Sequence, residues 1–303
     1  MKEVHISVLK EEAIAALAVR PGGRYIDGTL GRAGHAREIL ARGGAVLGID
    51  RDDAALAAVG ALGLDGLTVA KGNHGDLAQI AREHGWSEVD GVLLDLGVSS
   101  PQLDEADRGF SFLREGPLDM RMDRAGGVTA ADLVNGEGAE RLAEIFRDYG
   151  EEPQAKRIAK AVAAARGRGV RFETTTQLAD FVERTVGRRG GHHPATRVFQ
   201  ALRMAVNDEL GELERALEGG LAILKPGGRF AVITFESLSD RMTKRFFAAH
   251  VGKMRALQQG GEEWVGEEPK ARAVTRKAVT AGEDELKQNP RSRSAKLRAV
   301  ERT

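Results

Sequence analysis

The sequence predicts an α/β protein in which a doubly wound, mostly parallel sheet carries an inserted helical domain. In the first hundred residues, short apolar runs alternate with helical patterns. Continuous apolar runs are typical of parallel strands buried on both faces, and their alternation with helices is typical of βαβ units. The alternation then stops for about 130 residues, far longer than one crossover helix. This gap predicts a separate domain inserted into the sheet domain.

Each element of the sheet domain is predicted from its own run of residues. The strands before the gap are predicted at 24–27, 45–50, 67–70 and 89–96, with helices between them at 32–42, 52–62 and 76–84. After the gap, RFAVITF predicts a strand at 229–235, behind a turn that runs from Lys225 to Gly228. A last pair of strands is predicted at 271–279 and 295–301.

The gap itself contains helical patterns. They lie at 139–149, 152–166 and 175–186, and a longer one at 194–224 leads back into the sheet. We therefore expect a helical domain over 106–196. The sheet domain would be discontinuous, made of residues 1–105 and 197–303.

Composition excludes several classes of protein. The 303 residues include no cysteine, so disulfides, thiolate metal sites and a cysteine nucleophile are excluded. No signal peptide or membrane-spanning run is evident, which predicts a cytoplasmic protein. No histidine has a metal-ligand spacing with carboxylates, so no metal site is expected.

The net charge of zero hides an uneven distribution. Residues 153–200 carry a net charge of +7 and residues 269–303 a net charge of +6, so the rest of the chain carries −13. Lys156 and Arg157 begin the first basic segment at helical spacing, either as a solvated face or as a contact for phosphates. The distribution suggests a nucleic-acid partner that the total charge does not.

A glycine-rich turn follows the first predicted strand in the sequence DGTLGRAGH, from Asp27 to His35. Glycines allow the backbone to approach a ligand, and a helix N-terminus offers unpaired N–H groups. The alternative is a tight turn that binds nothing. Asp50 ends the second strand, where a carboxylate accepts hydrogen bonds from both ribose hydroxyls of a nucleoside. Its alternative role is to cap the next helix, for which Asp52 competes.

The segment from Asp95 to Gln102, DLGVSSPQ, ends the fourth strand, at the edge where parallel sheets bind ligands. Ser-Ser-Pro resembles a signature of methyltransferases that modify exocyclic amines. Such an amine needs an acceptor that turns its lone pair toward the methyl donor, and positioning matters more than a strong base. Our catalytic candidates are Asp95, Ser99, Ser100 and Pro101. The signature ends in an aromatic residue, but Gln102 stands here, so Phe110 or Phe112 would stack on the base unless both form core.

Several motifs occur in order over nearly the whole chain: GTLGRAGH, GVLLDLGVSSPQLDEADRGFSF, GPLDMRMD, YGEEPQAKRIAKAV, HPATRVFQALRMAVNDEL and NPRSRSAKLRAVER. Together they resemble the bacterial MraW (RsmH) family of S-adenosylmethionine-dependent methyltransferases. The resemblance implies a class I methyltransferase fold with a helical substrate-recognition insert. It also implies methylation of N4 of a cytidine in the decoding centre of 16S rRNA, in the small ribosomal subunit.

The resemblance also implies which residues bind S-adenosylmethionine. Asp50 would hold the ribose, the turn at Ala33 to His35 would meet the methionine part, and His74 would lie beside the adenine. The full set is Gly31, Ala33, Gly34, His35, Asp50, His74, Asp95 and Gln102. We expect Phe110, Phe112, Lys156, Arg157 and Glu236 to contact the RNA.

Three positions depart from the family pattern. The family usually has Phe at the position of His74, Gly at that of Ala33, and His at that of Glu236. The last departure places a glutamate beside the active site, where it would alter a substrate contact or the pH dependence. Two other functions remain open on the residues alone: an NAD-dependent oxidoreductase, and a non-catalytic RNA-binding protein with a vestigial cofactor pocket. The oligomeric state, monomer or homodimer, is not indicated.

Overall fold

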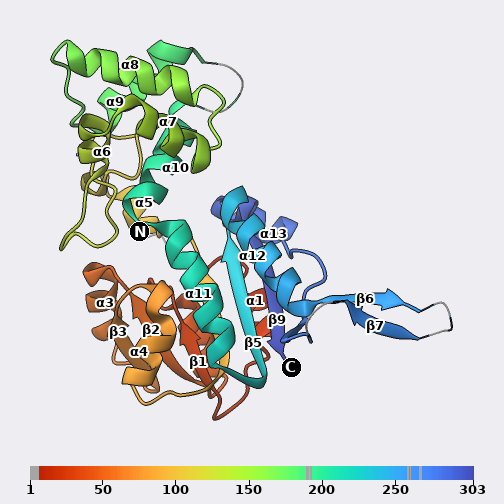
Figure 1. Ribbon diagram of the computed structural model, residues 1–303. Helices are drawn as coiled ribbons and strands as arrows, with labels where there is room; N and C mark the ends of the chain where they lie inside the picture. The colour runs from red at the N-terminus through yellow and green to blue at the C-terminus, as the bar shows by residue number, and fades with distance from the viewer. Residues whose placement is uncertain (1–6, 189–190, 192, 258, 260, 266–267) are drawn as a thin grey trace. The chain divides into compact units, whose positions relative to one another are not determined.

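The computed structural model describes residues 7–188, 191, 193–257, 259, 261–265 and 268–303 (Figure 1). They form two compact units. The sheet unit comprises the described residues within 1–97 and 211–303, and the helical unit comprises those within 98–210. Within these described residues, no helix is both long and apolar enough to cross a membrane.

The sheet unit contains a seven-stranded sheet in the order β3-β2-β1-β4-β5-β9-β8. The first five strands in this order pair in parallel, whereas β9 pairs antiparallel with β5 and β8. The strands are β1 (Arg24–Asp27), β2 (Ala45–Asp50), β3 (Leu67–Lys71), β4 (Val89–Asp95), β5 (Leu224–Thr234), β8 (Ala271–Ala273) and β9 (Lys296–Arg302). The predicted fold class, a class I methyltransferase-like α/β sheet, is confirmed.

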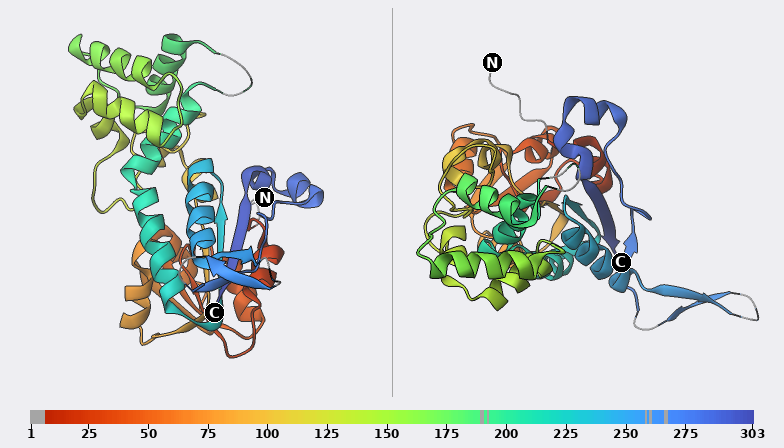
Figure 2. Two further views of the ribbon diagram at one scale, coloured as in Figure 1. Left: turned by 45° about the vertical axis from the view of Figure 1, so that its right-hand side comes forward. Right: turned by 90° about the horizontal axis from the view of Figure 1, so that it is seen from above.

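Helices cover both faces of this sheet (Figure 2). Neighbouring strand residues point to opposite faces, so Tyr25 packs with α1 (Lys10–Leu17) and α2 (Gly34–Ala41), and Ile26 lies in the opposite core. That opposite core includes side chains of α4 (Leu77–Glu83), α11 (Glu209–Ile223) and α12 (Ser237–Val251). The remaining helical elements of the unit are α3 (Asp53–Gly60), η1 (His74–Asp76), α13 (Glu283–Gln288) and η3 (Pro290–Ser294).

The helical unit has a core of its own. Its elements are α5 (Ser100–Asp104), η2 (Ala106–Arg108), α6 (Ala130–Gly136), α7 (Ala139–Asp148), α8 (Ala155–Gly167), α9 (Thr175–Val186) and α10 (Ala195–Val206). The expected limits, 106 and 196, fall inside the unit. Val98 and Leu103 at one end and Ala205 and Val206 at the other pack against this core, so the unit spans 98–210.

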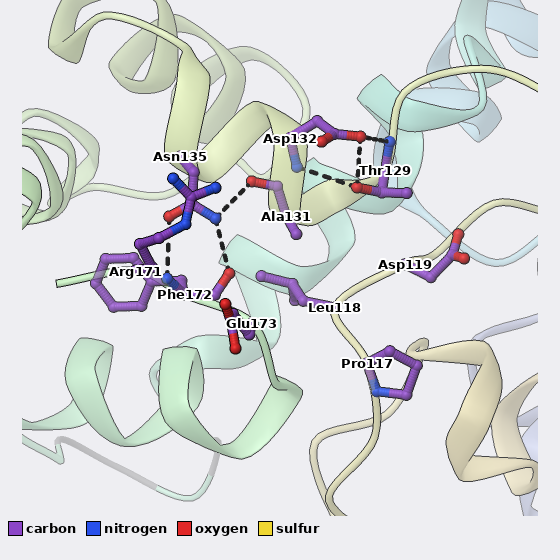
Figure 3. A pocket seen from close by; sticks show the side chains of 10 residues that line it. All are labelled: Pro117, Leu118, Asp119, Thr129, Ala131, Asp132, Asn135, Arg171, Phe172 and Glu173. Carbon is purple, nitrogen blue, oxygen red and sulfur yellow. Dashed lines mark hydrogen bonds between the residues drawn. The ribbon is translucent and has the colours of Figure 1, made fainter.

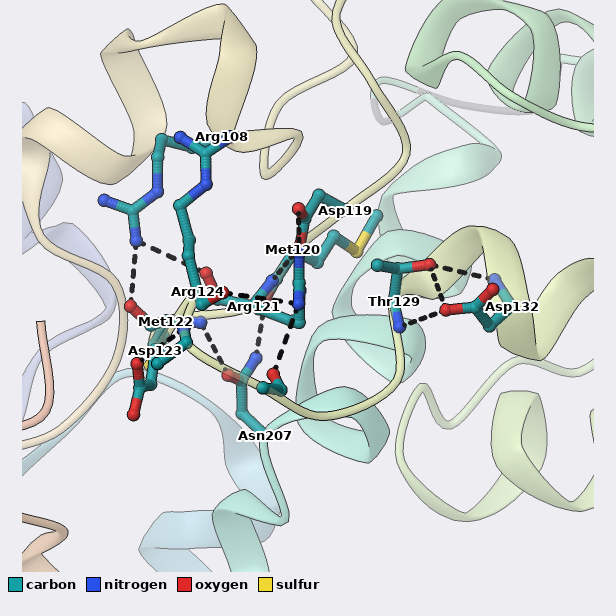
Figure 4. Close-up of polar contacts among 12 residues, drawn as sticks. Arg108, Asp119, Met120, Arg121, Met122, Asp123, Arg124, Thr129, Asp132 and Asn207 are labelled. Atoms are coloured by element: carbon teal, nitrogen blue, oxygen red, sulfur yellow. Dashed lines mark hydrogen bonds and ion pairs between the residues drawn. The ribbon is translucent and has the colours of Figure 1, made fainter.

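The single long helix expected at 194–224 is wrong. The chain forms α10 and α11 instead, because Asp208 adopts a left-handed conformation with φ 48°. Asn207, which is 7% exposed, ends α10 and donates from Nδ2 to the carbonyl of Arg203 at 2.8 Å. The same Nδ2 also donates to the carbonyl of Met120 at 2.8 Å (Figure 4). This bond connects the end of α10 to the GPLDMRMD segment.

Other elements differ in extent or were not predicted. The strand expected at 271–279 is only β8, followed by an isolated bridge between Val279 and Leu297. The turn expected at 225–228 lies within β5, which pairs irregularly with β4 between Val89 and Gly91. The sequence patterns did not indicate α1, α12, or the hairpin of β6 (Lys253–Ala256) and β7 (Glu262–Val265).

Candidate cofactor site at the carboxyl edge of the sheet

The glycine-rich turn after β1 is fixed to the strands on both of its sides. The N–H of Gly28 donates to the carbonyl of Leu93 on β4 at 2.9 Å, and that of Leu30 donates to Ile49 on β2 at 3.0 Å. A Cβ at Gly48 would lie 2.6 Å from the Leu30 side chain, so this glycine lets the turn fold against β2. The strand order reverses at β1, which makes this edge the expected ligand crevice of an open α/β sheet.

The second half of the turn adopts left-handed backbone conformations. Gly31 has φ 50° and Ala33 has φ 60°, a conformation that disfavours any residue with a Cβ. Gly34 begins α2, and a Cβ there would lie 1.8 Å from Oγ of Ser7. The close approach that Gly34 permits in this structure is therefore that of the N-terminal segment.

Asp50 is free of the helix-capping role. Asp52 caps α3 instead, because its side chain accepts the N–H of Ala54 at 3.0 Å. The carboxylate of Asp50 accepts the N–H of Gly31 through Oδ2 at 2.8 Å and that of Asp52 through Oδ1 at 2.9 Å. Burial raises the pKa of Asp50, and these two bonds oppose that shift. Each oxygen retains capacity to accept a second bond from a ligand hydroxyl.

Two carboxyl groups lie beside the turn, Asp27 fully buried and Asp95 with a side chain that is 25% exposed. Asp27 is 1% exposed and accepts the N–H of Thr29 at 3.2 Å, while Oγ1 of Thr29 accepts the N–H of Asp95 at 2.6 Å. Burial, reinforced by the neighbouring carboxylate Asp50, raises the pKa of Asp27 to about 7. Burial and the charge of Asp27 raise the pKa of Asp95 to about 8. The pair would gain from a ligand that brings donors or positive charge.

One carboxylate oxygen of Asp95 can accept a hydrogen bond from a ligand. Its Oδ1 is buried and finds no hydrogen-bond partner in the described part of the chain. Its other oxygen, Oδ2, lies 3.8 Å from Nδ1 of His35, beyond hydrogen-bond distance. His35 is buried, and its Nε2 donates to the carbonyl of Val8 at 3.1 Å, which fixes the ring against the N-terminal segment.

His74 occupies the turn after β3. Gly72 donates its N–H to the carbonyl of Asp50 at 3.0 Å, and a Cβ at Gly28 would lie 3.5 Å from the Cβ of His74. Burial, with the positive charges of Arg51 and Arg215, lowers the pKa of His74 to about 3, so its ring is neutral. Its Nε2 is buried, and none of the described residues supplies it with a hydrogen bond.

The Ser-Ser-Pro segment begins the helical unit. Ser99 and Gln102 form a capping box at α5: Oγ of Ser99 accepts the N–H of Gln102 at 3.4 Å, and Oε1 of Gln102 accepts that of Ser99 at 3.0 Å. Gln102 is 6% exposed, and Pro101 lies in the first turn. Ser99, Ser100 and Pro101 remain partly accessible.

The two candidate stacking residues occupy different environments. Phe110 is 7% exposed in the core of the helical unit, with the guanidinium of Arg108 5.8 Å from its ring centre. Phe112 is only partly buried, and its ring centre lies 4.9 Å from that of Phe199 and 4.7 Å from that of His193. Phe110 thus takes the core alternative, while Phe112 retains exposed ring surface.

The other expected RNA contacts lie at the surface or close to it. Lys156 and Arg157 are exposed on α8, whose opposite side buries Ile158, Ala159 and Val162. Glu236 is the partly buried N-cap of α12, directly after β5, and its carbonyl accepts the N–H of Asp240 at 3.1 Å.

A separate pocket of about 290 Å³ lies in the helical unit (Figure 3). Asn135 fixes its wall: its Nδ2 donates to the carbonyls of Ala131 and Phe172 at 2.8 Å, and its Oδ1 accepts the N–H of Phe172 at 3.0 Å. These bonds hold the wall together and leave Asn135 little capacity for a ligand. Across the described residues, no group of three or more His, Asp or Glu side chains is placed to hold a metal ion.

A family model described as the MraW methylase family matches residues 2–303. The chain belongs to the MraW methylase family. A protein of Symbiobacterium thermophilum named ribosomal RNA small subunit methyltransferase H is 50% identical to it, over 98% of this chain and 96% of that protein. Relatives of the same name in a Paenibacillus species and in Paramagnetospirillum magneticum are 47% and 48% identical, covering 98% and 99% of this chain and 99% and 96% of their own.

Solved structures resemble this MraW family member less closely. TrmN from Thermus thermophilus is 14% identical and aligns with a TM-score of 0.42, over 97% of this chain and 48% of its own. Such a match is too loose to transfer any residue.

S-adenosylmethionine is the cofactor of this MraW methylase, which decides against the NAD-dependent alternative. The residues at the sheet edge fit such a group. Asp50 offers both carboxylate oxygens, while Oδ1 of Asp95 and Nε2 of His74 are buried polar atoms in need of a partner. A sulfonium and an amino group would also supply the positive charge that the two carboxyl groups lack.

Sequence reasoning missed two parts of this arrangement. Asp27 was noticed only as the first residue of the turn, although a charged residue at the end of a buried parallel strand is itself a signal. Glu212 of α11 is the second: its buried carboxylate accepts Nδ2 of Asn73 and the N–H of Gly75, the residues on either side of His74. It gave no signal, because a glutamate in a helical pattern is usually exposed.

Proposed function

We propose that this MraW-family methyltransferase methylates N4 of a cytidine in the decoding centre of 16S rRNA, with the small ribosomal subunit as its partner. The observation that carries the proposal is the buried Oδ1 of Asp95, a hydrogen-bond acceptor at the end of β4 to which no described residue donates. The names of the relatives support the choice of RNA, because they are called small subunit rRNA methyltransferases.

The turn and the strand ends would hold the cofactor. Asp50 accepts hydrogen bonds from the ribose hydroxyls, and Ala33 to His35 surround the methionine part. His74 lies beside the adenine of the cofactor. Gly31 and Gln102 complete this proposed set. When bound, S-adenosylmethionine supplies an electrophilic methyl group that requires a correctly placed nucleophile.

Asp95 would position the amine and manage its proton. The carboxylate accepts one N–H of the exocyclic amine, which turns the nitrogen lone pair away from the ring and toward the methyl group. The same carboxylate can take the proton that the amine loses after methylation, because its pKa of about 8 is close to neutral pH. Ser99, Ser100 and the backbone near Pro101 would hold the other edge of the cytidine.

The helical unit would recognise the RNA. The exposed cations of α8, Lys156 and Arg157, would bind phosphates, which supply affinity without sequence specificity. The accessible ring of Phe112 would stack on a base, a role for which buried Phe110 is not available. Glu236, at the end of β5, is the proposed substrate contact in the sheet unit.

A transfer assay tests the function directly. Purified protein is incubated with labelled S-adenosylmethionine and small ribosomal subunits that lack the modification, and the RNA nucleosides are then identified by mass spectrometry. We expect label in N4-methylcytidine, loss of most label with Asp95→Ala, and unchanged label with the exposed control Asp65→Ala. Cofactor binding without transfer to subunits or naked rRNA would favour the non-catalytic RNA-binding alternative.

A further inference from the structure

Glu212 is an unusual buried residue in the first turn of α11, a helix that covers the sheet. Only 5% of it is exposed, and its carboxylate accepts Nδ2 of Asn73 through Oε1 at 3.1 Å and the N–H of Gly75 through Oε2 at 3.1 Å. Arg215, one turn further along α11, pairs with Oε1 at 2.7 Å. The two residues that Glu212 holds therefore flank His74 on either side.

The geometry around Gly75 shows how closely this contact is built. A Cβ at Gly75 would lie 2.2 Å from Oε2 and 3.1 Å from the backbone oxygen of Glu212, so a larger residue there would displace the carboxylate. On the same helix, a Cβ at Gly219 would lie 3.2 Å from the Cβ of Ala78, which brings α11 close to the start of α4. The turn that carries His74 is thus fixed to α11 through its backbone and one side chain.

The position of His74 identifies the part of the ligand that it would meet. The sheet order β3-β2-β1 places the end of β3 beyond Asp50, counted from the glycine-rich turn after β1. With the ribose on Asp50, the nucleobase extends toward β3 and its following turn, where Nε2 of His74 is buried and has no hydrogen-bond partner in the part of the chain that the structure describes. A buried polar atom of this kind is costly unless a ligand satisfies it.

We propose that Glu212 is a positioning residue that, through Asn73 and Gly75, holds His74 so that its Nε2 forms a hydrogen bond with the edge of the adenine of S-adenosylmethionine. The proposal rests on the proposed ribose contact of Asp50. It assigns to His74 a polar contact that the phenylalanine usual in the family cannot make. The neutral ring suits this role, because a neutral imidazole nitrogen can pair with a purine edge without bringing a buried charge.

Calorimetric titration with S-adenosylhomocysteine tests the proposal through a double-mutant cycle. Glu212→Gln keeps the shape of the side chain but places an NH₂ group against a donor of the turn. We expect a Kd about 3- to 10-fold weaker for Glu212→Gln and about 10-fold weaker for His74→Phe, which loses one hydrogen bond. If Glu212 acts through His74, the double variant binds about as tightly as His74→Phe alone.

The matched control is Glu214→Gln, on the exposed side of the same helix, which should leave Kd unchanged. A nitrogen-15 NMR spectrum adds a direct signature: the Nε2 resonance of His74 should shift when S-adenosylhomocysteine binds, and by less in Glu212→Gln. The proposal would be overturned if Glu212→Gln weakened Kd by the same factor in the wild-type chain and in His74→Phe. An Nε2 resonance of His74 that does not move on binding would overturn it as well.

These titrations also distinguish a failure of the Glu212 proposal from a failure of the proposed methyl transfer. Asp50→Ala should abolish detectable binding, and retained binding would remove the ribose contact on which the argument rests. None of these titrations contains RNA, so failure of methyl transfer to ribosomal subunits would leave their outcome unaffected. Melting curves for each variant establish that the weaker binding does not come from unfolding.

Discussion

At the scale of single residues, the site is defined by two carboxyl groups, Asp27 and Asp95, whose pKa values the protein raises to about 7 and about 8. Asp27 and Asp95 are linked through Thr29, which donates its backbone N–H to the first and accepts the backbone N–H of the second with its hydroxyl. Their raised pKa values mean that the folded protein holds protons that the unfolded chain has released. Such a pair is expected at a functional site rather than in a purely structural core.

The first residue-scale prediction concerns activity. Asp95 must be ionised to accept the amine N–H, so kcat/KM for S-adenosylmethionine should rise with pH up to about 8, by up to tenfold per unit. Steady-state rates between pH 6 and 9 measure this profile. Asp95→Asn should lose the rise together with most of the activity. A wild-type profile that is flat from pH 6 to 8.5 would remove Asp95 from the proton-accepting role.

The buried carboxyl group of Asp27 should also make the stability of the folded protein depend on pH. Because the folded pKa of Asp27 is about 7 and its ordinary value is 3.8, the free energy of unfolding should fall as pH rises through this interval. Asp27→Asn removes the buried charge and should raise the melting temperature at pH 8 by about 2–6 °C, with no gain at pH 4. Calorimetric scans at the two pH values, with exposed Asp65→Asn as control, measure the difference. An equal gain at both pH values would contradict the assignment.

At the scale of elements, the strands could be predicted well because each is a short buried run with its own pattern. The limits of β1 and β2 agree with the prediction residue for residue, and α9 does as well. The break between α10 and α11 could not be predicted, because Asn207 is stabilised by backbone groups of Arg203, Met120 and Met122, two of them distant in sequence. Local periodicity contains no information about such partners.

The same contrast holds within the candidate site. Asp50 and Asp95 stand at strand ends, where the parallel-sheet pattern itself predicts a ligand. The role of Glu212 depends on a turn more than a hundred residues earlier in the chain, so only the folded structure reveals it. Phe110 and Phe112 share one motif, and only packing distinguishes the buried ring from the accessible one.

The element-scale prediction tests the break after α10. Oδ1 of Asn207 also accepts the N–H of Met122 at 2.9 Å, so Asn207→Ala leaves several buried backbone groups unpaired. We expect a loss of about 1–3 kcal/mol in the free energy of unfolding. Denaturant titration measures it, and proteolysis within 108–128 should become faster. Gln79→Ala, which removes an exposed amide, should change neither; equal effects of the two variants would contradict this account.

At the scale of the whole molecule, the net charge of zero is the sum of two basic segments and an acidic remainder. The first basic segment coincides with α8, whose buried side is apolar and whose exposed side carries Lys156 and Arg157. The proposed phosphate contacts Lys156 and Arg157 lie in the helical unit, whereas the proposed cofactor contacts Asp50 and His74 lie in the sheet unit.

We therefore expect RNA binding and cofactor binding to respond to different substitutions. Lys156→Glu combined with Arg157→Glu should weaken binding to small subunits and make the salt dependence of log K shallower by about 1.5–2. The Kd for S-adenosylhomocysteine should not change. Filter binding at several salt concentrations, compared with Arg37→Glu combined with Arg82→Glu on exposed positions of the sheet unit, measures the effect. Equal weakening by both pairs would show that α8 has no special role.

Nucleoside analysis of 16S rRNA tests most directly whether this MraW methylase modifies N4 of one cytidine in that RNA. RNA is prepared from cells that lack the protein and from the same cells supplied with the wild-type chain or Asp95→Ala. We predict that N4 methylation of the decoding-centre cytidine is lost without the protein, restored by the wild-type chain and not restored by Asp95→Ala. N4-methylated cytidine that persists in the cells without the protein would contradict the account.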